Sequence, residues 1–323
     1  MRRVTSAAAM AAGLALVLGA CGSDDTTDET SDGSASGGVS IDYHHGTLSL
    51  DEPATTVVAL EWSLVEDLLA LGVEPAGVAD VEGYGLWVAA GPQLGDDVVD
   101  VGTRQEPSLE QIAALEPDLI LTDDDRTGGN LADLEEIAPT YSSDFYGRNG
   151  GQLQTMRDTF THIATLTGTE DAADDVLADL DARTEEFTSA LQSSDVPSTF
   201  LLTQGYTYEG AATVRIFGAP TMASELLESA GMTNGWTGET DSYGLTDTDV
   251  EGLTNADPSS SMIYVAQEDD NIFTGELADN PVYQGLDFVA NDRVHPIDPG
   301  AWLWGGPVTA VTIFDEVEAA LGL

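Results

Sequence analysis

Residues 170–194 read EDAADDVLADLDARTEEFTSALQSS, and no glycine or proline interrupts them. Their apolar residues recur at steps of three and four, while Asp, Glu and Arg fill the opposite side. This pattern predicts a long amphipathic helix. The apolar stripe consists of Val176, Leu177, Leu180, Phe187 and Leu191. At 1.5 Å per residue such a helix spans roughly 35 Å, about the width of a small domain.

The segments on both sides of this helix show the same alternation of strand and helix signals. Strand signals lie at 56–60, 73–79, 98–101 and 118–121 before the helix, and at 199–203 and 262–266 after it. Helix signals lie at 64–71, 109–116 and 223–229. Such alternation is typical of α/β units with parallel strands. We therefore predict two Rossmann-like α/β lobes with mainly parallel sheets, joined by the long helix, with the ligand cleft between the lobes.

The beginning of the chain carries a secretory signature. Arg2 and Arg3 precede an apolar run over 7–20, and the only cysteine of the sequence, Cys21, follows directly. The run is too short to span a membrane and is typical of a signal peptide. Because the arrangement resembles a bacterial lipobox, we expect Cys21 to be lipidated. The protein is then extracytoplasmic and lipid-anchored to the outer face of the cytoplasmic membrane.

Composition completes the predicted domain plan. Residues 22–38 are Ser, Thr, Asp and Gly with no apolar periodicity, which indicates a flexible tether. The predicted parts are a lipoprotein signal peptide at 1–20, a tether at 21–40, an N-terminal lobe at 41–168, a linker helix at 169–195 and a C-terminal lobe at 196–323.

Charge is the least ordinary feature of the composition. The sequence has 58 acidic and nine basic residues, all arginine, for a formal net charge of −49. Such a field repels nucleic acid and argues against binding to anionic lipid by charge. It fits a halophilic or salt-tolerant protein, because screening at high salt reduces acidic self-repulsion. Since cations are scarce, the place of each one is informative, and Arg104 directly follows a predicted strand.

Two segments, 108–117 and 249–258, share one spacing. Each has a helix-capping residue, an acid two positions on, and a proline seven positions after the acid. The acids are Glu110 and Glu251, which are predicted to occupy equivalent first turns in the two lobes. Their simplest role is to complement the helix dipole, but that local role does not require a matched pair.

Four motifs resemble the ferric hydroxamate-binding proteins of bacterial siderophore importers. They are ALEWSLVEDLLALGVEPAGVAD (59–80), DVGTRQEPSLE (100–110), FGAPTMASELLESAGMTNGWTGETDSYG (217–244) and AWLWGGPVTA (301–310). The resemblance implies the substrate-binding component of an ABC importer, a non-enzymatic protein without a cofactor, whose ligand is an iron(III)–siderophore complex. That class also has lobes joined by one long helix.

The resemblance further implies a set of site residues. The aromatic cleft and its arginine correspond to Trp62, Trp87, Arg104, Trp236, Tyr243, Trp302 and Trp304. Aromatic faces suit the apolar shell of a ferric hydroxamate, and a guanidinium donates to its oxygens. Arg215 departs from the family pattern, and if it faces the cleft it favours a citrate-containing chelator. Arg126 lies where an aromatic residue is expected.

Partners also follow from the resemblance. This class of importer docks its permease through one acid on each lobe, and Glu110 and Glu251 match those positions. A monomer is expected, and because the chelator fully ligates the iron, no metal ligands from the protein are predicted.

Other functions remain as alternatives. Cobalamin and haem are bound by proteins with this fold. A binder of bare metal ions needs several histidines and carboxylates at one point, whereas only His44, His45, His162 and His295 exist. A metal-dependent enzyme needs a defined catalytic cluster, and the run of Asp at 123–125 is better explained as solvated.

Overall fold

The computed structural model describes residues 37–127, 129–147 and 151–323. The predicted signal peptide, Cys21 and most of the predicted tether lie outside the described residues. The first strand, β1 (Val39–Tyr43), begins within the last two residues of the predicted tether. It forms an antiparallel hairpin with β2 (Gly46–Leu50).

The first lobe contains a five-stranded sheet in which every pairing is parallel. In spatial order the strands are β5 (Val99–Asp100), β4 (Gly77–Val78), β3 (Val57–Ala59), β6 (Leu119–Asp123) and β7 (Thr140–Ser143). The helices are α1 (Trp62–Ala70), α2 (Val81–Trp87), α3 (Leu109–Ala114), α4 (Asp124–Thr127), α5 (Leu131–Glu135) and α6 (Gln152–Thr167). The predicted parallel α/β lobe is confirmed, with β7 as a strand that the sequence pattern had not revealed.

The second lobe contains a mixed sheet of six strands. Its order is β11 (Leu245–Thr248), β9 (Ala211–Phe217), β8 (Thr199–Tyr208), β12 (Ser261–Val265) and β13 (Val294–Pro296), and β10 (Thr233–Asn234) also pairs with β8. The helices are α8 (Met222–Ser229), α9 (Pro281–Gln284), α10 (Asp287–Ala290) and α11 (Pro307–Leu321), with 3₁₀ turns η1 (Gly252–Asn255) and η2 (Glu268–Asp270). Three pairings are parallel, whereas β8–β9 and β9–β11 are antiparallel.

The antiparallel part of the second sheet depends on one tight turn. Glu209 and Gly210, between β8 and β9, both have positive φ, at 50° and 82°. Two consecutive positive φ values are typical of the two-residue hairpin turn whose twist matches the strands. Glycine adopts this conformation without steric cost. The hairpin carries Arg215 on β9 toward the site described below.

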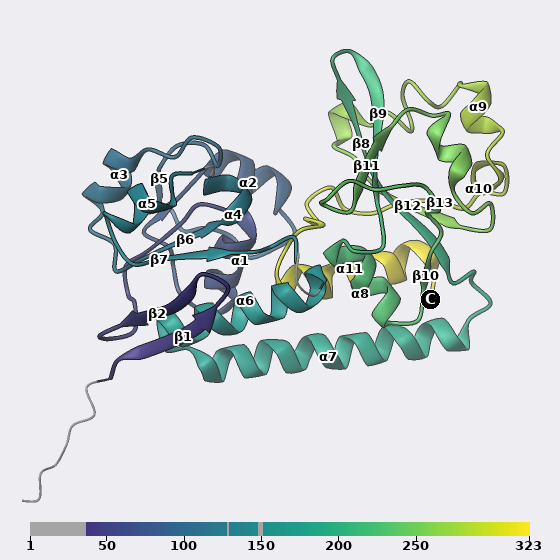
Figure 1. Ribbon diagram of the computed structural model, residues 1–323. Coiled ribbons are helices and arrows are strands. Elements are labelled where there is room, and N and C mark those ends of the chain that lie inside the picture. The colour runs from purple at the N-terminus through teal and green to yellow at the C-terminus, as the bar shows by residue number, and fades with distance from the viewer. Residues whose placement is uncertain (1–36, 128, 148–150) are drawn as a thin grey trace, which may run out of the picture. The chain divides into compact units, whose positions relative to one another are not determined.

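Helix α7 (Glu170–Ser193) is the predicted joining helix, and it has 24 residues. It packs against α6 and α11 and runs beneath both lobes in Figure 1. Ala173, near its start, belongs to the core of the first lobe, whereas Leu180, Phe187 and Leu191 belong to a core of the second lobe. The N-terminal part of the helix therefore packs on the first lobe, and the rest of the helix packs on the second lobe.

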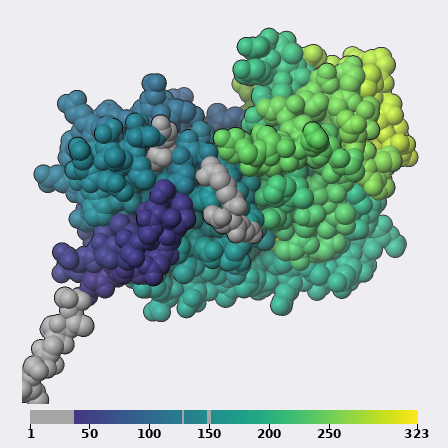
Figure 2. All heavy atoms as spheres, in the orientation of Figure 1, coloured from purple at the N-terminus to yellow at the C-terminus, as the bar shows by residue number. Residues whose placement is uncertain are grey.

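Two further contacts hold the lobes together within the compact unit Ser36–Leu323. At the start of α6, the Gln152 side chain donates to the Tyr243 carbonyl and accepts from the Met222 amide. On α1, fully buried Glu66 accepts from the Thr309 amide at 2.7 Å and the Thr309 hydroxyl at 2.6 Å, at the N-terminus of α11. Figure 2 shows the surface hollowed at the upper edge of this face, where the lobes meet.

Candidate ligand-binding site

The first lobe supplies one wall of a cavity of about 370 Å³. Glu61 and Ser63 follow β3, Arg104 follows β5, Asp123 ends β6, and Tyr146 follows β7. The carboxyl ends of neighbouring parallel strands gather at one edge of a sheet, which is where ligands of open α/β sheets bind. The order of strands therefore explains why residues 61 and 146 meet.

The second lobe supplies the facing wall. Arg215 lies on β9, Tyr243 and Asp247 lie before and on β11, and Trp302 and Trp304 lie in the segment that leads into α11. The cavity is thus built from both lobes. An adjoining cavity of about 290 Å³ shares four lining residues with it. The shared residues are Arg104, Arg215, Trp302 and Trp304.

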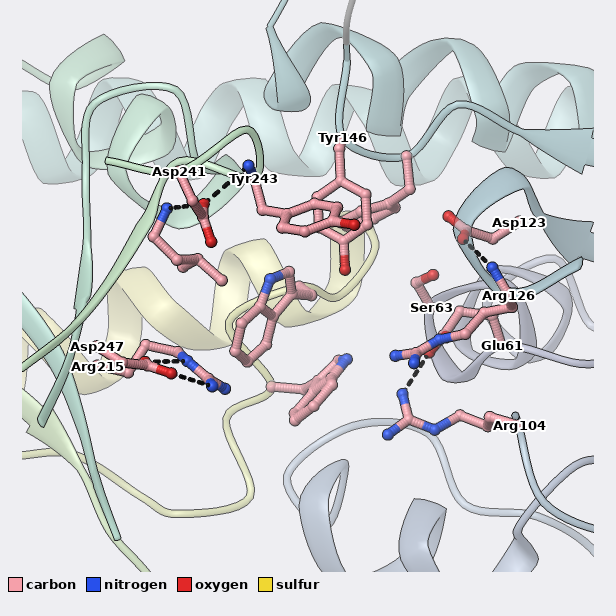
Figure 3. Close-up of a pocket in the computed structure, with 14 residues that line it drawn as sticks. Glu61, Ser63, Arg104, Asp123, Arg126, Tyr146, Arg215, Asp241, Tyr243 and Asp247 are labelled. Carbon is pink, nitrogen blue, oxygen red and sulfur yellow. Dashed lines mark hydrogen bonds and ion pairs between the residues drawn. The ribbon is translucent and has the colours of Figure 1, made fainter. Parts of the chain in front are cut away.

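Glu61 joins two arginines at the cavity wall. Its carboxylate accepts from Arg104 Nη1 at 2.8 Å and from Arg126 Nε at 2.7 Å, as Figure 3 shows. It also caps α1 by accepting from the Trp62 amide at 2.9 Å. The Glu61 side chain is only 9 % exposed, so solvent screens these ion pairs less than it screens pairs on the surface. The carboxylate fixes both guanidinium groups before any ligand arrives.

Four indole rings lie around Arg104. Its guanidinium carbon stacks over Trp62, 3.4 Å from the ring centroid, in cation–π geometry. The Trp302 ring lies 5.1 Å from Trp62, 4.7 Å from Trp304 and 6.2 Å from Trp87. Trp62 is buried and supports the arginine from below, whereas Trp302 and Trp304 line both cavities. The rings therefore form one continuous aromatic wall.

Three buried donors at this wall have no acceptor among the described residues. They are the indole Nε1 atoms of Trp302 and Trp304 and the Nε atom of Arg104. A buried donor without a partner costs about 1–3 kcal/mol. A ligand oxygen removes this cost where the side chains turn these donors into the cavity. Aromatic faces beside a guanidinium suit a molecule that is apolar over most of its surface and carries a few oxygens.

Arg215 faces the cavity, but a carboxylate holds it. Its Nε and Nη2 atoms donate to the two oxygens of Asp247 at 2.8 and 3.0 Å, and Nη2 also reaches the Tyr206 hydroxyl at 2.9 Å. Figure 3 shows this fork-shaped pair at the second-lobe side of the cavity. The charge of Arg215 is therefore already balanced by Asp247, whereas Arg104 and Arg126 share the single negative charge of Glu61.

The cavity is nearly neutral in a very acidic protein. Among the described residues, three arginines line it, together with the acids Glu61, Asp123, Asp241 and Asp247. Burial of Asp123, followed by its proximity to Glu61, raises the pKa of Asp123 to about 7. With Asp123 ionised the formal charge of the described lining residues is −1, and with Asp123 protonated it is zero.

This pKa predicts that ligand affinity rises as pH falls. Below about pH 7 the Asp123 carboxyl becomes neutral, which removes a negative charge that repels ligand oxygens. Half a unit charge at about 8 Å with an effective dielectric of about 20 corresponds to roughly 1 kcal/mol, or about fivefold. We expect Kd to decrease about fivefold between pH 8 and pH 6, measured with a ferric chelate whose own charge is constant over that range.

The Asp123→Asn variant is the control for this prediction. It carries a neutral group of the same shape, so its affinity at pH 8 should equal that of the wild type at pH 6 and should not change with pH. An unchanged pH profile in the variant would assign the dependence to another group.

The structure brings together most of the residues predicted from the sequence. Trp62, Trp87, Arg104, Arg215, Tyr243, Trp302 and Trp304 all line one or both cavities. Trp236 does not lie among the described residues that line either of them. It pairs with Ala256 in an isolated β-bridge and packs against a core of the second lobe. The placement of Trp236 in the cleft is therefore corrected: pairing of β10 with β8 directs the following residues toward that core.

Sequence reasoning missed several cavity residues. Glu61 was overlooked because its arginine partners lie far along the chain. Phe145 and Tyr146 follow β7 directly, and Tyr146 packs edge-on against Tyr243 with centroids 4.6 Å apart. Two adjacent aromatic residues soon after the end of a strand could have indicated these cavity residues from the sequence. Arg126 occupies a position where the family resemblance implies an aromatic residue, and Tyr146 supplies an aromatic ring beside it in the cavity lining.

The two candidate docking acids lie on the surface. Glu110 occupies the first turn of α3, which Ser108 caps by accepting from the Gln111 amide at 3.3 Å. Glu251 immediately precedes η1, and Asp249 accepts from the Gly252 amide at 3.1 Å. The predicted Ser108 cap is confirmed. The second element is a 3₁₀ turn whose N-cap is Glu251 and not Asp249, so Glu251 precedes the first turn and does not lie within it. Both acids are exposed.

Among the described residues, no helix combines the length and the apolar character needed to cross a bilayer. The sequence contains the apolar run at 7–20 outside those residues.

Two α/β lobes joined by one helix, with a cavity of indoles and arginines between them, define a solute-binding protein of the two-lobed class. The chain belongs to the periplasmic binding protein family, which it matches over residues 57–301. The family relatives reported below are binding proteins and not enzymes.

Two relatives and one solved structure are similar over most of the chain. The iron(3+)-hydroxamate-binding protein FhuD of Escherichia coli is 31% identical over 270 residues, covering 82% of this chain and 86% of FhuD. The Fe(3+)-citrate-binding protein YfmC of Bacillus subtilis is 25% identical over 291 residues, covering 89% and 87%. The crystal structure of the siderophore-binding protein FhuD from Vibrio cholerae with bound Fe³⁺–Desferal has a TM-score of 0.72, 26% identity and coverage of 83% and 97%.

Proposed function

We propose that this protein captures a ferric siderophore in the cavity between its lobes and delivers it to the permease of an ABC importer. The observation that carries the proposal is the wall formed by Trp302, Trp304 and Arg104, whose three buried donors lack acceptors among the described residues. A siderophore complex has an apolar shell with exposed chelating oxygens, which are acceptors of the kind that those donors need. The names of the reported relatives, which bind iron(3+) hydroxamate and Fe(3+) citrate, support the same class of ligand.

The cavity carboxylates suit an iron ion that arrives already chelated. Glu61 is engaged by Arg104 and Arg126, and Asp247 by Arg215. A protein that bound bare Fe³⁺ would direct such oxygens at the metal. In this cavity the carboxylates of Glu61 and Asp247 orient guanidinium groups. The N–H groups that do not contact these carboxylates can face the chelator.

Charge favours a hydroxamate chelator. In a ferric trihydroxamate the three hydroxamate anions balance the charge of Fe³⁺, so the complex is neutral and fits a lining whose formal charge is zero or −1. A citrate-hydroxamate chelator is the second candidate, because Arg215 lines the cavity and can bind a carboxylate if it leaves Asp247. The reported relatives give no support to cobalamin or haem.

Tryptophan fluorescence tests this proposal directly. Four of the five tryptophans line the cavities, so a bound ferric chelate should quench most of the emission, and the iron-free chelator much less. Titrations with ferric hydroxamate, citrate-hydroxamate and catecholate chelators then rank the classes. Equal responses to ferrated and iron-free chelators would contradict the proposal.

Trp236 offers a matched control within the same protein. Trp236→Phe should leave the ligand-induced quenching almost unchanged, since this ring packs on the second-lobe core. The double change of Trp302→Phe and Trp304→Phe should remove much of the quenching and weaken binding. Quenching that disappears only with Trp236 would place the ligand elsewhere.

We further propose the location and organisation of the protein. Lipidation of Cys21 anchors a monomer to the outer face of the cytoplasmic membrane, where the tether before β1 gives the folded part freedom to meet its permease. Domain limits of 41–168 and 196–323 around the linker helix remain part of this proposal. The acidic surface, with a formal net charge of −49 for the chain, fits a salt-rich environment.

A further inference from the structure

One group of described side chains that could bind a metal ion lies outside the ligand cavity. His44 and His45 form the turn of the β1–β2 hairpin, and Asp124 is the first residue of α4. His44 Nε2 lies 3.0 Å from Asp124 Oδ2, and His45 Nε2 lies 2.8 Å from Asp124 Oδ1. Two of the four histidines in the chain therefore reach one carboxylate that is about 80 positions further along.

The geometry of the three side chains suits a divalent transition metal. One ligand atom from each residue can be chosen so that all three lie within 4.8 Å of one another. In a tetrahedral Zn²⁺ site with bonds of about 2.0–2.1 Å to nitrogen, neighbouring ligand atoms are about 3.3 Å apart. The two nitrogen–oxygen distances, 3.0 and 2.8 Å, need to lengthen by only a few tenths of an ångström, and the third distance lies within the 4.8 Å limit of the group.

The surroundings of the group hold the ligands in place. The Ser142 hydroxyl donates to Asp124 Oδ1 at 2.5 Å, and the Tyr43 ring packs edge-on against both imidazoles, with centroids 5.2 and 5.7 Å away. Hydrogen-bonded partners of this kind orient metal ligands. The side chains are 29 % exposed for His44, 37 % for His45 and 19 % for Asp124. An ion can therefore enter from solvent and keep water in its remaining positions.

We propose that His44, His45 and Asp124 bind one divalent ion of the Zn²⁺ class, at a site separate from the siderophore cavity. Two imidazoles and one carboxylate are donors that such ions prefer, whereas Mg²⁺ and Ca²⁺ prefer oxygen ligands alone. The ion joins the β1–β2 hairpin to the turn after β6. Asp123, which ends β6 directly before Asp124, and Arg126 on α4 both line the cavity, so the ion braces the rear of the ligand site.

Calorimetric titration of the purified protein with Zn²⁺ tests the proposal. The protein must carry no polyhistidine tag, and a large excess of Mg²⁺ must be present to occupy the many surface carboxylates. We expect one equivalent of Zn²⁺ to bind under these conditions and to raise the melting temperature, because the ion binds only the folded arrangement. Zn²⁺ binding that Mg²⁺ abolishes would overturn the proposal.

Matched variants identify the ligands. Ser142 only hydrogen-bonds the ligand Asp124, so Ser142→Ala should weaken Zn²⁺ binding roughly 10–100-fold. His44→Ala and His45→Ala each remove a ligand and should weaken it at least as much. His295→Gln, which changes a histidine on β13 of the second lobe, should bind like the wild type. Retention of one equivalent in the His44→Ala/His45→Ala double variant would place the ion elsewhere and refute the assignment.

Discussion

Replacing Glu110 and Glu251 together with alanine is expected to reduce siderophore uptake to the level of cells that lack the protein. The family resemblance implies that one acid on each lobe pairs with permease arginines. Within the described residues neither side chain has a hydrogen-bond or ion-pair partner of its own, and both are exposed. Each acid is thus available to a partner. Truncating one member of a charge pair that becomes buried on docking costs about 2–5 kcal/mol, and two such losses remove productive docking.

Ligand affinity separates this effect from damage to the cavity. In the purified double variant, Kd for the ferric chelate should stay within about twofold of the wild type, since surface substitutions change free energies by about 0.5 kcal/mol or less. Asp175→Ala with Glu186→Ala is the matched control, because it removes two exposed acids from α7. Normal uptake in the docking variant, or equal loss in the α7 control, would refute the assignment.

The joining helix shows what the sequence pattern could predict. Residues 170–194 were predicted as helical, and α7 covers Glu170–Ser193. The prediction succeeded because helix periodicity is visible within one segment, and because the apolar residues in both halves of the helix pack into the core of a lobe. The parallel first sheet followed from the same kind of local alternation. The hairpin of β8 and β9 did not, since its antiparallel pairing depends on the turn at Glu209 and Gly210.

The ligand cavity contains contacts that no local sequence pattern predicts. Arg104 could be predicted as a site residue because it is one of few cations and follows the end of a strand. Its partnership with Glu61 joins residues 43 positions apart, and that of Arg126 joins residues 65 apart. From the sequence, Arg215 is either a cavity residue or a solvent-facing arginine on a strand. It is in fact a cavity residue held by Asp247, because β11 lies beside β9.

Trp236 and the two adjacent histidines show two different limits of local pattern: the first was predicted to be a site residue, and the others were not. The motif around Trp236 resembled the family, yet the direction of an aromatic side chain depends on which core its neighbours join. A site for bare metal ions is not expected from the sequence, because the chain has only four histidines and His44 and His45 lie at the edge of the first lobe. Asp124 comes within hydrogen-bonding distance of both only because the fold brings the residue after β6 to the β1–β2 hairpin. The positions of these side chains therefore depended on tertiary contacts, as did the β8–β9 hairpin, whereas the joining helix and the first sheet followed from local pattern.

Replacing Arg104 with glutamine is expected to weaken ferric hydroxamate binding about 10–100-fold. A hydrogen bond from a charged donor contributes about 1.5–3 kcal/mol, and the change also removes the cation stacked 3.4 Å above Trp62. Arg104→Lys should recover little affinity, because an ammonium lacks the planar fork that stacks and donates at once. Arg157→Gln, which breaks an ion pair with Asp181 between α6 and α7, is the control for loss of one arginine.

Glu61 decides whether Arg104 acts through charge or through position. If the carboxylate serves to hold the guanidinium in place, Glu61→Gln should weaken hydroxamate binding, and the combined change with Arg104→Gln should cost less than the sum of the two. If it serves mainly to neutralise charge, Glu61→Gln leaves Arg104 and Arg126 without their carboxylate and should strengthen binding of citrate-containing chelates. The 2.8 and 2.7 Å contacts with two different arginines favour positioning, because one carboxylate can balance only one of the two charges yet orients both. Additive effects in the double-mutant cycle would contradict this interpretation.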